Sequence, residues 1–196
     1  MEQSCVESAD VIEHGYHYMF SSASLSLKLY EESKERLHLA NVYVMTAFAL
    51  EAYVNELCEL SLPQRLWRIV DRRANTVEKI TVIEVHWHAQ FDYCKPPFQL
   101  VKEIFRVRDA FAHARQEKVP ALEVRDGVKT VVRPIAPIEV LLDDPSRARR
   151  YLTCVYELMG YLDQFNPWRR GRGHPMASAA VSTWIALRLA PLQNNE

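Results

Sequence analysis

Apolar residues recur every three to four positions over most of this chain, which predicts a protein built mainly from α-helices. In residues 8–35 the apolar positions share one side of a helix, whereas residues 36–61 are apolar on nearly every side. A helix that is apolar all round is typical of a helix buried inside a bundle. We therefore expect residues 36–61 to form the core helix, with residues 8–35 packed beside it.

Prolines and capping residues divide the following chain into further helices. Proline is well tolerated in the first turn of a helix, and Asp is a favoured N-cap, so Asp144 and Pro145 predict a helix start. Residues 74–91 contain both a helix-start signal and an alternating, strand-like run, and we favour the helix. The predicted helices cover residues 63–73, 74–91, 95–117 and 143–165.

Two segments differ from this helical pattern. In residues 121–134, two β-rich runs flank Asp126-Gly127, which is a strong hairpin signal. Residues 176–190 are apolar and predict a C-terminal helical extension, packed on the bundle or across a dimer. The expected fold is all-α: one domain over residues 1–196, an up-and-down helical bundle with one inserted β-hairpin.

Composition favours a cytoplasmic protein that does not enter the membrane. The acidic N-terminal stretch lacks the apolar core of a signal peptide, and the longest apolar run, residues 42–50, is too short to cross a bilayer. None of the four cysteines forms a C-x-x-C pair, so we expect reduced thiols. Only five glycines occur, which argues against a glycine-rich phosphate loop.

A net charge of −1 conceals an uneven distribution of charge. Residues 1–96 carry 9 basic and 14 acidic side chains, whereas residues 97–196 carry 15 basic and 11 acidic ones. The second half is therefore the better candidate for binding a polyanion such as RNA. The arginines expected to contact RNA are Arg106, Arg115, Arg169, Arg170 and Arg172.

The stretch RVRDAFAHAR, residues 106–115, combines groups suited to phosphate chemistry. A guanidinium such as that of Arg108 binds phosphate oxygens, and an imidazole such as that of His113 transfers protons near neutral pH. Asp109 and His113 are four residues apart and share a helix face, so Asp109 could orient the imidazole. Arg108 and His113 lie roughly 140° apart around an ideal helix, so the arginine must bend back or meet a second copy. The alternative is an ordinary amphipathic helix with a surface arginine and a histidine capped by Asp109.

Glu51 interrupts an otherwise apolar helix, with Asn55 four residues later on the same face. A buried carboxylate is costly without a partner, so we predict that Glu51 contacts Arg108 or lies within a dimer cleft. Glu84, His86, His88 and Asp92 lie close together in the sequence, and their side chains are of the types that bind metal ions. Their spacing matches no established ligand set, so we predict no metal site.

The spacing of Arg108 and His113 resembles the R-x4-6-H signature of the HEPN family, and the run AFALEAYVNELCEL, residues 47–60, is similar to that family's buried helix. The resemblance covers residues 8–165. It implies a homodimeric helical bundle that cleaves single-stranded RNA without metal or cofactor. His113 would be the general acid or base, Arg108 would stabilise charge on the phosphate, and Asp109 would orient the site.

The resemblance also implies a toxin–antitoxin, stress or defence setting, with an antitoxin or another regulatory protein as a possible partner. Many HEPN domains lack nuclease activity, so two alternatives stay open. One is a non-catalytic module that binds nucleic acid, nucleotide or a partner protein. The other is a purely structural helical dimer.

Overall fold

The structure is a computed structural model that describes residues 15–112, 123–125, 128–130 and 137–167. The described chain is mostly helical, as the apolar periodicity predicts. The helices are α1 (Gly15–Ser33), α2 (Arg36–Ser61), α3 (Gln64–Arg73), α4 (Thr76–His86), α5 (Pro96–Ala112), α6 (Pro137–Leu142) and α7 (Pro145–Phe165). The predicted bounds of α2 are confirmed, and α6 is a helix that the sequence analysis did not anticipate.

Two short strands, β1 (Glu123–Arg125) and β2 (Val128–Thr130), pair antiparallel within the segment where the hairpin was predicted. Their register places Glu123 opposite Thr130 and Arg125 opposite Val128. The intervening residues 126–127 lie outside the described residues, as does the whole segment 176–190. The hairpin as a complete unit and the C-terminal helical extension therefore stay predictions.

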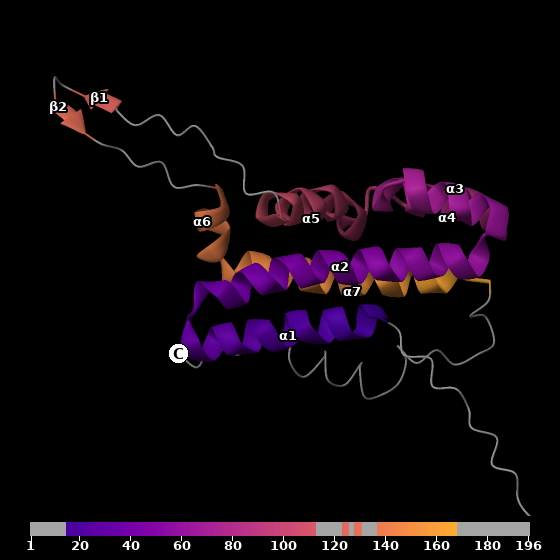
Figure 1. Cartoon of the computed structure of the whole chain (residues 1–196), viewed down its shortest axis with the longest axis horizontal. Helices are drawn as coiled ribbons and strands as arrows, with labels where there is room; N and C mark the ends of the chain where they lie inside the picture. Colours follow the sequence, from indigo (N-terminus) through magenta and orange to yellow (C-terminus); the bar gives the residue numbers. More distant parts are fainter. Residues whose placement is uncertain (1–14, 113–122, 126–127, 131–136, 168–196) are drawn as a thin grey trace, which may run out of the picture.

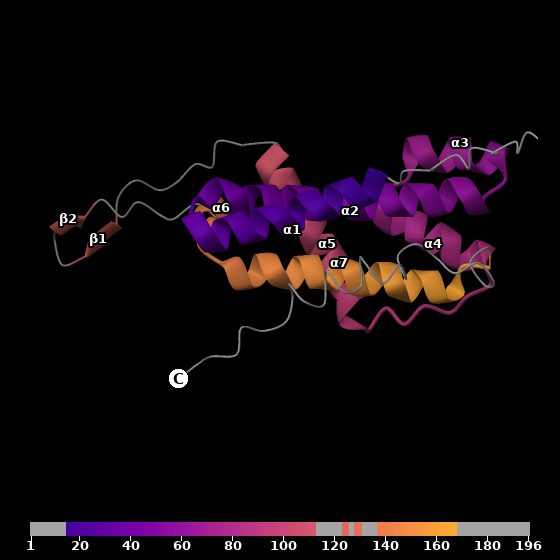
Figure 2. The same cartoon turned by 90° about the horizontal axis from the view of Figure 1, so that it is seen from below.

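Helix α2 is the centre of the bundle and contacts each of the other six described helices. It forms an antiparallel hairpin with α1, and α7 runs alongside both, while α3, α4 and α5 cover another side of α2 (Figures 1 and 2). Leu50, Val54 and Leu57 of α2 are fully buried. Burial on several sides explains why this helix is apolar all round.

Among the described residues, α2 is also the one helix that is long and apolar enough to cross a membrane. The uninterrupted run at residues 42–50 is short, but the whole helix satisfies the length and composition criteria. Half of its most apolar window is buried inside the bundle, and the core helix of a bundle meets the same criteria. Packing against the other helices therefore accounts for the apolar character of α2.

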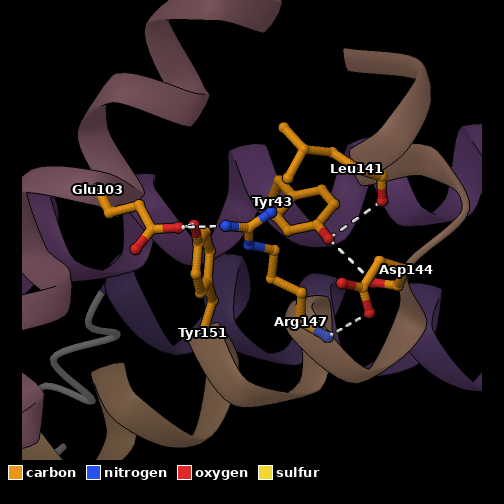
Figure 3. Close-up of polar contacts among 6 residues, drawn as sticks. All are labelled: Tyr43, Glu103, Leu141, Asp144, Arg147 and Tyr151. Atoms are coloured by element: carbon orange, nitrogen blue, oxygen red, sulfur yellow. Dashed lines mark hydrogen bonds and ion pairs between the residues drawn. The ribbon is translucent and has the colours of Figure 1, made fainter. Parts of the chain in front are cut away.

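A polar network joins α2, α5 and α7 at one end of the bundle (Figure 3). The hydroxyl of Tyr43 lies 3.1 Å from the carbonyl oxygen of Leu141 and 3.0 Å from that of Asp144, which ties α2 to the turn before α7. On α5, Glu103 Oε1 accepts hydrogen bonds from Tyr151 (2.5 Å) and Arg147 (2.9 Å) of α7. Tyrosine hydroxyls inside a core thus find acceptors, as buried polar groups must.

The start of α7 agrees with the sequence. Asp144 is the N-cap, its side chain accepts a hydrogen bond of 3.0 Å from the backbone N–H of Arg147, and Pro145 is the first helical residue. This bond satisfies one of the backbone donors that the first turn leaves without a partner. The predicted start of this helix is confirmed.

The helix predicted over residues 74–91 is shorter than expected. It begins with a capping box, in which Asn75 Oδ1 accepts from the backbone of Glu78 and Glu78 Oε2 accepts from the backbone of Asn75. It ends at His86, and two residues later His88 adopts a left-handed conformation with a φ of 51°. A left-handed residue is incompatible with a continuing right-handed helix, so the prediction of helix as far as residue 91 was wrong.

Candidate functional site

The predicted contact between Glu51 and Arg108 is present. Arg108 Nη1 donates a hydrogen bond of 3.3 Å to Glu51 Oε2, across 57 residues of chain. The two side chains are half-buried, with 24% of Arg108 and 36% of Glu51 exposed. A carboxylate on the apolar helix α2 therefore has its charged partner on α5, as the cost of burying it alone requires.

Three further side chains hold the Arg108 guanidinium. Asp109 Oδ1 forms an ion pair with Arg108 Nε at 2.8 Å, although the N–H does not point along this contact and Nε makes no hydrogen bond to a described residue. The rings of Phe48 and Phe105 lie 5.8 and 5.3 Å from the guanidinium carbon, within the range of cation–π attraction. Asp109, expected to orient His113, thus contacts Arg108 in the described structure.

Arg108 faces an open cleft of about 600 Å³ between α5, the first turn of α4 and α2. Its lining residues are Glu51, Asn75, Thr76, Val77, Glu78, Lys102, Phe105, Arg106, Arg108 and Asp109. At the first turn of α4 the capping box already engages the backbone N–H groups of Asn75 and Glu78, and it places the Glu78 carboxylate in the lining. The cleft is therefore lined by side chains of both charges.

The charged side chains of this cleft differ in whether they already form an ion pair. Glu51 and Asp109 are both in contact with Arg108. Lys102 and Arg106 are exposed and form no ion pair with any residue of the described part. An anion that enters the cleft therefore meets two uncommitted cations, and reaches Arg108 only by competing with its two carboxylates.

Several residues predicted for the site lie outside the described residues. Helix α5 ends at Ala112, and the next residue, His113, is one of these. Arg115, Arg169, Arg170 and Arg172 also lie outside the described part. Of the five arginines predicted to bind RNA, Arg106 is the one that the structure places, and it lines the cleft.

Asn55, predicted to support Glu51, has a different partner. Its Oδ1 accepts a hydrogen bond of 2.8 Å from Lys79 of α4, and Lys79 is only 5% exposed. The Lys79 ammonium also lies 3.7 Å from Asp71 Oδ1 and 5.4 Å from the Trp67 ring centre, both on α3. Asn55 therefore helps join α2, α3 and α4 and is not among the residues that line the Arg108 cleft, so a supporting role at the site stays a prediction.

Within the described ranges, no group of three or more His, Cys, Asp or Glu side chains is arranged to hold a metal ion. Glu84, one of the two acidic residues of the considered cluster, accepts hydrogen bonds from the backbone of Phe91 (2.7 Å) and the hydroxyl of Tyr93 (2.5 Å). It closes the loop between α4 and α5. Burial, followed by the hydrogen bond to Glu84, raises the pKa of Tyr93 to about 12.

Lys102 and Phe105 belong to the site but were not selected from the sequence. Lys102, Arg106 and Asp109 stand at i, i+4 and i+7 on α5, so they share one helix face. That spacing is visible in the sequence and identifies the face. The contact of Phe105 with the guanidinium depends on where Glu51 of α2 holds Arg108, which no local sequence pattern shows.

Comparison of the chain with family models, with curated proteins and with solved structures found no match. The resemblance of residues 8–165 to HEPN proteins accordingly rests on the motif residues and on the order of the helices.

Proposed function

We propose that this protein is a metal-independent endoribonuclease of the HEPN type, which cleaves single-stranded RNA by attack of a 2′-hydroxyl on the adjacent phosphate. The observation that carries the proposal is the position of Arg108. Glu51 and Asp109 hold its guanidinium at an open cleft, and His113 follows five residues later in the chain. The reaction needs a guanidinium and an imidazole at one phosphate, and the proposal assigns the imidazole to His113.

The proposed chemistry uses proton transfer and charge stabilisation. A neutral His113 imidazole takes the proton of the 2′-hydroxyl. The 2′-oxygen bonds to phosphorus as the bond between phosphorus and the 5′-oxygen breaks. An imidazolium then protonates the departing 5′-oxygen. Arg108 stabilises the charge that builds on the other phosphate oxygens. The products carry a 2′,3′-cyclic phosphate and a 5′-hydroxyl.

The proposed active form is a cytoplasmic homodimer. On an ideal helix Arg108 and His113 point roughly 140° apart, so one straight helix does not aim both at a single phosphate. Two copies related by a twofold axis bring the arginine of one chain close to the histidine of the other.

Cys58, Cys94 and Cys154 are free thiols, as expected for a reducing compartment.

A second candidate function is a non-catalytic RNA-binding module. The observation that favours it is that the Arg108 guanidinium already contacts two carboxylates and two aromatic rings. In this alternative Arg108 is a structural residue, while Lys102 and Arg106 attract the phosphates. RNA is then retained and remains intact.

A cleavage assay separates the two functions. Purified protein is incubated with labelled single-stranded RNA in EDTA, beside the variants Arg108→Ala and His113→Ala. Matched controls are Arg65→Ala and His86→Ala, which remove an exposed arginine and an exposed histidine outside the cleft. The nuclease proposal expects cleavage by the wild type and both controls and its loss in both test variants. Binding without cleavage by the wild type supports the non-catalytic module.

A further inference from the structure

We propose that a second hollow beside the Arg108 cleft is a binding subsite for one unpaired nucleobase. This inference rests on the proposed function, because it assigns the base that neighbours the phosphate at Arg108. The hollow has a volume of about 390 Å³ and lies between α4 and α5. Its lining residues are Val77, Ile80, Tyr93, Phe98, Gln99, Val101 and Lys102.

The two hollows adjoin each other, and we refer to them together as the groove. Val77 of α4 and Lys102 of α5 line both of them. Gln99, Lys102 and Arg106 follow one another along one face of α5. Lys102 is separated from Gln99 and from Arg106 by about one helical turn each, a rise of roughly 5.4 Å. This distance is comparable to the spacing of successive phosphates along a single strand. A strand lying in the groove therefore places a base at one hollow and a phosphate at the other.

The base subsite has an aromatic wall. Tyr93 is 42% exposed, and its ring centre lies 4.9 Å from that of the buried Phe98. The hydrogen bond from the Tyr93 hydroxyl to Glu84 restrains the ring. A partly exposed aromatic ring that is held in place offers a stacking partner for an unpaired base.

Polar groups beside this wall match the edge of a base and its phosphate. Gln99 Nε2 donates a hydrogen bond of 2.9 Å to the carbonyl oxygen of Cys94, which leaves Gln99 Oε1 as an acceptor. The exocyclic amino groups of adenine and cytosine and the ring N3–H of uracil can each donate to such an oxygen. The ammonium of Lys102, which has no ion-pair partner in the described part, supplies the charge for the adjoining phosphate.

The test measures binding by the full chain to fluorescently labelled deoxyhexanucleotides, which lack the 2′-hydroxyl and are not cleaved by the proposed reaction. Probes of adenine, cytosine, uracil and abasic units carry the same phosphate charge. The subsite predicts that the adenine and cytosine probes bind on the order of ten-fold more tightly than the abasic probe. Uracil, which can also stack and can donate its N3–H, should likewise bind more tightly than the abasic probe.

Single substitutions test whether the preference for bases over abasic units arises in the groove. Tyr93→Ala removes the preference for bases over abasic units, whereas Tyr93→Phe keeps it. Gln99→Ala, a change at an exposed residue, weakens the binding of the adenine, cytosine and uracil probes more than that of the abasic probe. Lys102→Gln weakens every probe to a similar extent and lowers the slope of log Kd against log salt by about one. The matched control Lys95→Gln removes an exposed ammonium that lies over Tyr161, outside the groove, and leaves base preference unchanged.

The outcome is separable from that of the nuclease assay. A wild-type protein that binds the abasic probe as tightly as the adenine probe, or that binds no probe, overturns the base subsite even if it cleaves RNA. Retention of the base preference by both Tyr93→Ala and Gln99→Ala overturns it as well. A Tyr93-dependent preference without RNA cleavage supports the subsite and contradicts only the nuclease.

Discussion

Glu51 of α2 and Arg108 of α5 lie 57 residues apart in the chain, and their side chains meet at 3.3 Å beside an open cleft. The pair links the buried centre of the bundle to the helix that carries the proposed catalytic motif. Its geometry is set by the packing of α5 on α2. Glu51 is therefore expected to position Arg108 without itself touching RNA.

The first prediction concerns this pair. Glu51→Gln keeps the size and one acceptor oxygen but removes the charge that faces Arg108. Because the pair is only half-buried, we expect the free energy of unfolding to fall by about 1 kcal/mol or less. RNA cleavage should fall several-fold, because the guanidinium is held less firmly. The exposed Glu59→Gln on the same helix is the control for stability in urea and for cleavage. Wild-type cleavage by Glu51→Gln would count against a positioning role.

The second prediction concerns Lys79, the buried ammonium shared by α2, α3 and α4. Lys79→Met keeps the aliphatic stem but leaves Asn55 Oδ1 without its donor. Loss of a hydrogen bond to a charged group, with one acceptor left unsatisfied, should cost about 1–3 kcal/mol of unfolding free energy. Lys28→Met, which breaks an exposed pair with Glu32, should cost less than about 0.5 kcal/mol. Equal urea midpoints for the two variants would show that the Lys79 contacts add nothing.

A third prediction follows from Glu103 in the network of Figure 3. The hydrogen bond from Tyr151, together with Arg147, holds the pKa of Glu103 below its usual value. A lowered folded-state pKa stabilises the protein above the unfolded pKa, and this contribution is lost as pH falls through the folded pKa. Between about pH 5 and pH 3, unfolding free energy should therefore fall less steeply in Glu103→Gln than in the wild type. Glu157→Gln, an exposed carboxyl on α7, should keep the wild-type slope.

The fourth prediction concerns the cysteines. Burial raises the pKa of both Cys58 and Cys154 to about 12, whereas Cys94 is exposed. Because the thiolate is the reactive form, a short iodoacetamide pulse at pH 8 should label Cys94 and leave the two buried thiols unmodified. Peptide mass mapping identifies each site, and unfolding in urea should remove the difference. Fast labelling of Cys58 in the native protein would contradict its place in the core.

The sequence was most informative where one physical requirement acted alone. Residues 36–61 read as a core helix because their apolar residues cover nearly every side, and α2 has these bounds. The contact between Glu51 and Arg108 followed from the cost of an unpaired carboxylate in an apolar helix. Both inferences needed only the identity of a few residues and the order of the helices along the chain.

Other features depend on distances that a local pattern does not contain. Asn55 shares a helix face with Glu51, but the position of α4 gives it to Lys79. The network at Glu103 brings residues of α2, α5, α6 and α7 together, and its one visible signal was tyrosine at apolar positions, where a hydroxyl needs an acceptor. Helix α6 is a six-residue element, too short to show a helical period.

The central claim is metal-independent RNA cleavage by Arg108 and His113, and the ends of the reaction products test it most directly. A defined single-stranded RNA is incubated with the protein in EDTA, and the fragments are analysed by mass spectrometry. The account predicts a 2′,3′-cyclic phosphate on one fragment and a 5′-hydroxyl on the other, both absent with His113→Ala. Intact RNA, 5′-phosphate ends, or equal cleavage by His113→Ala would contradict it.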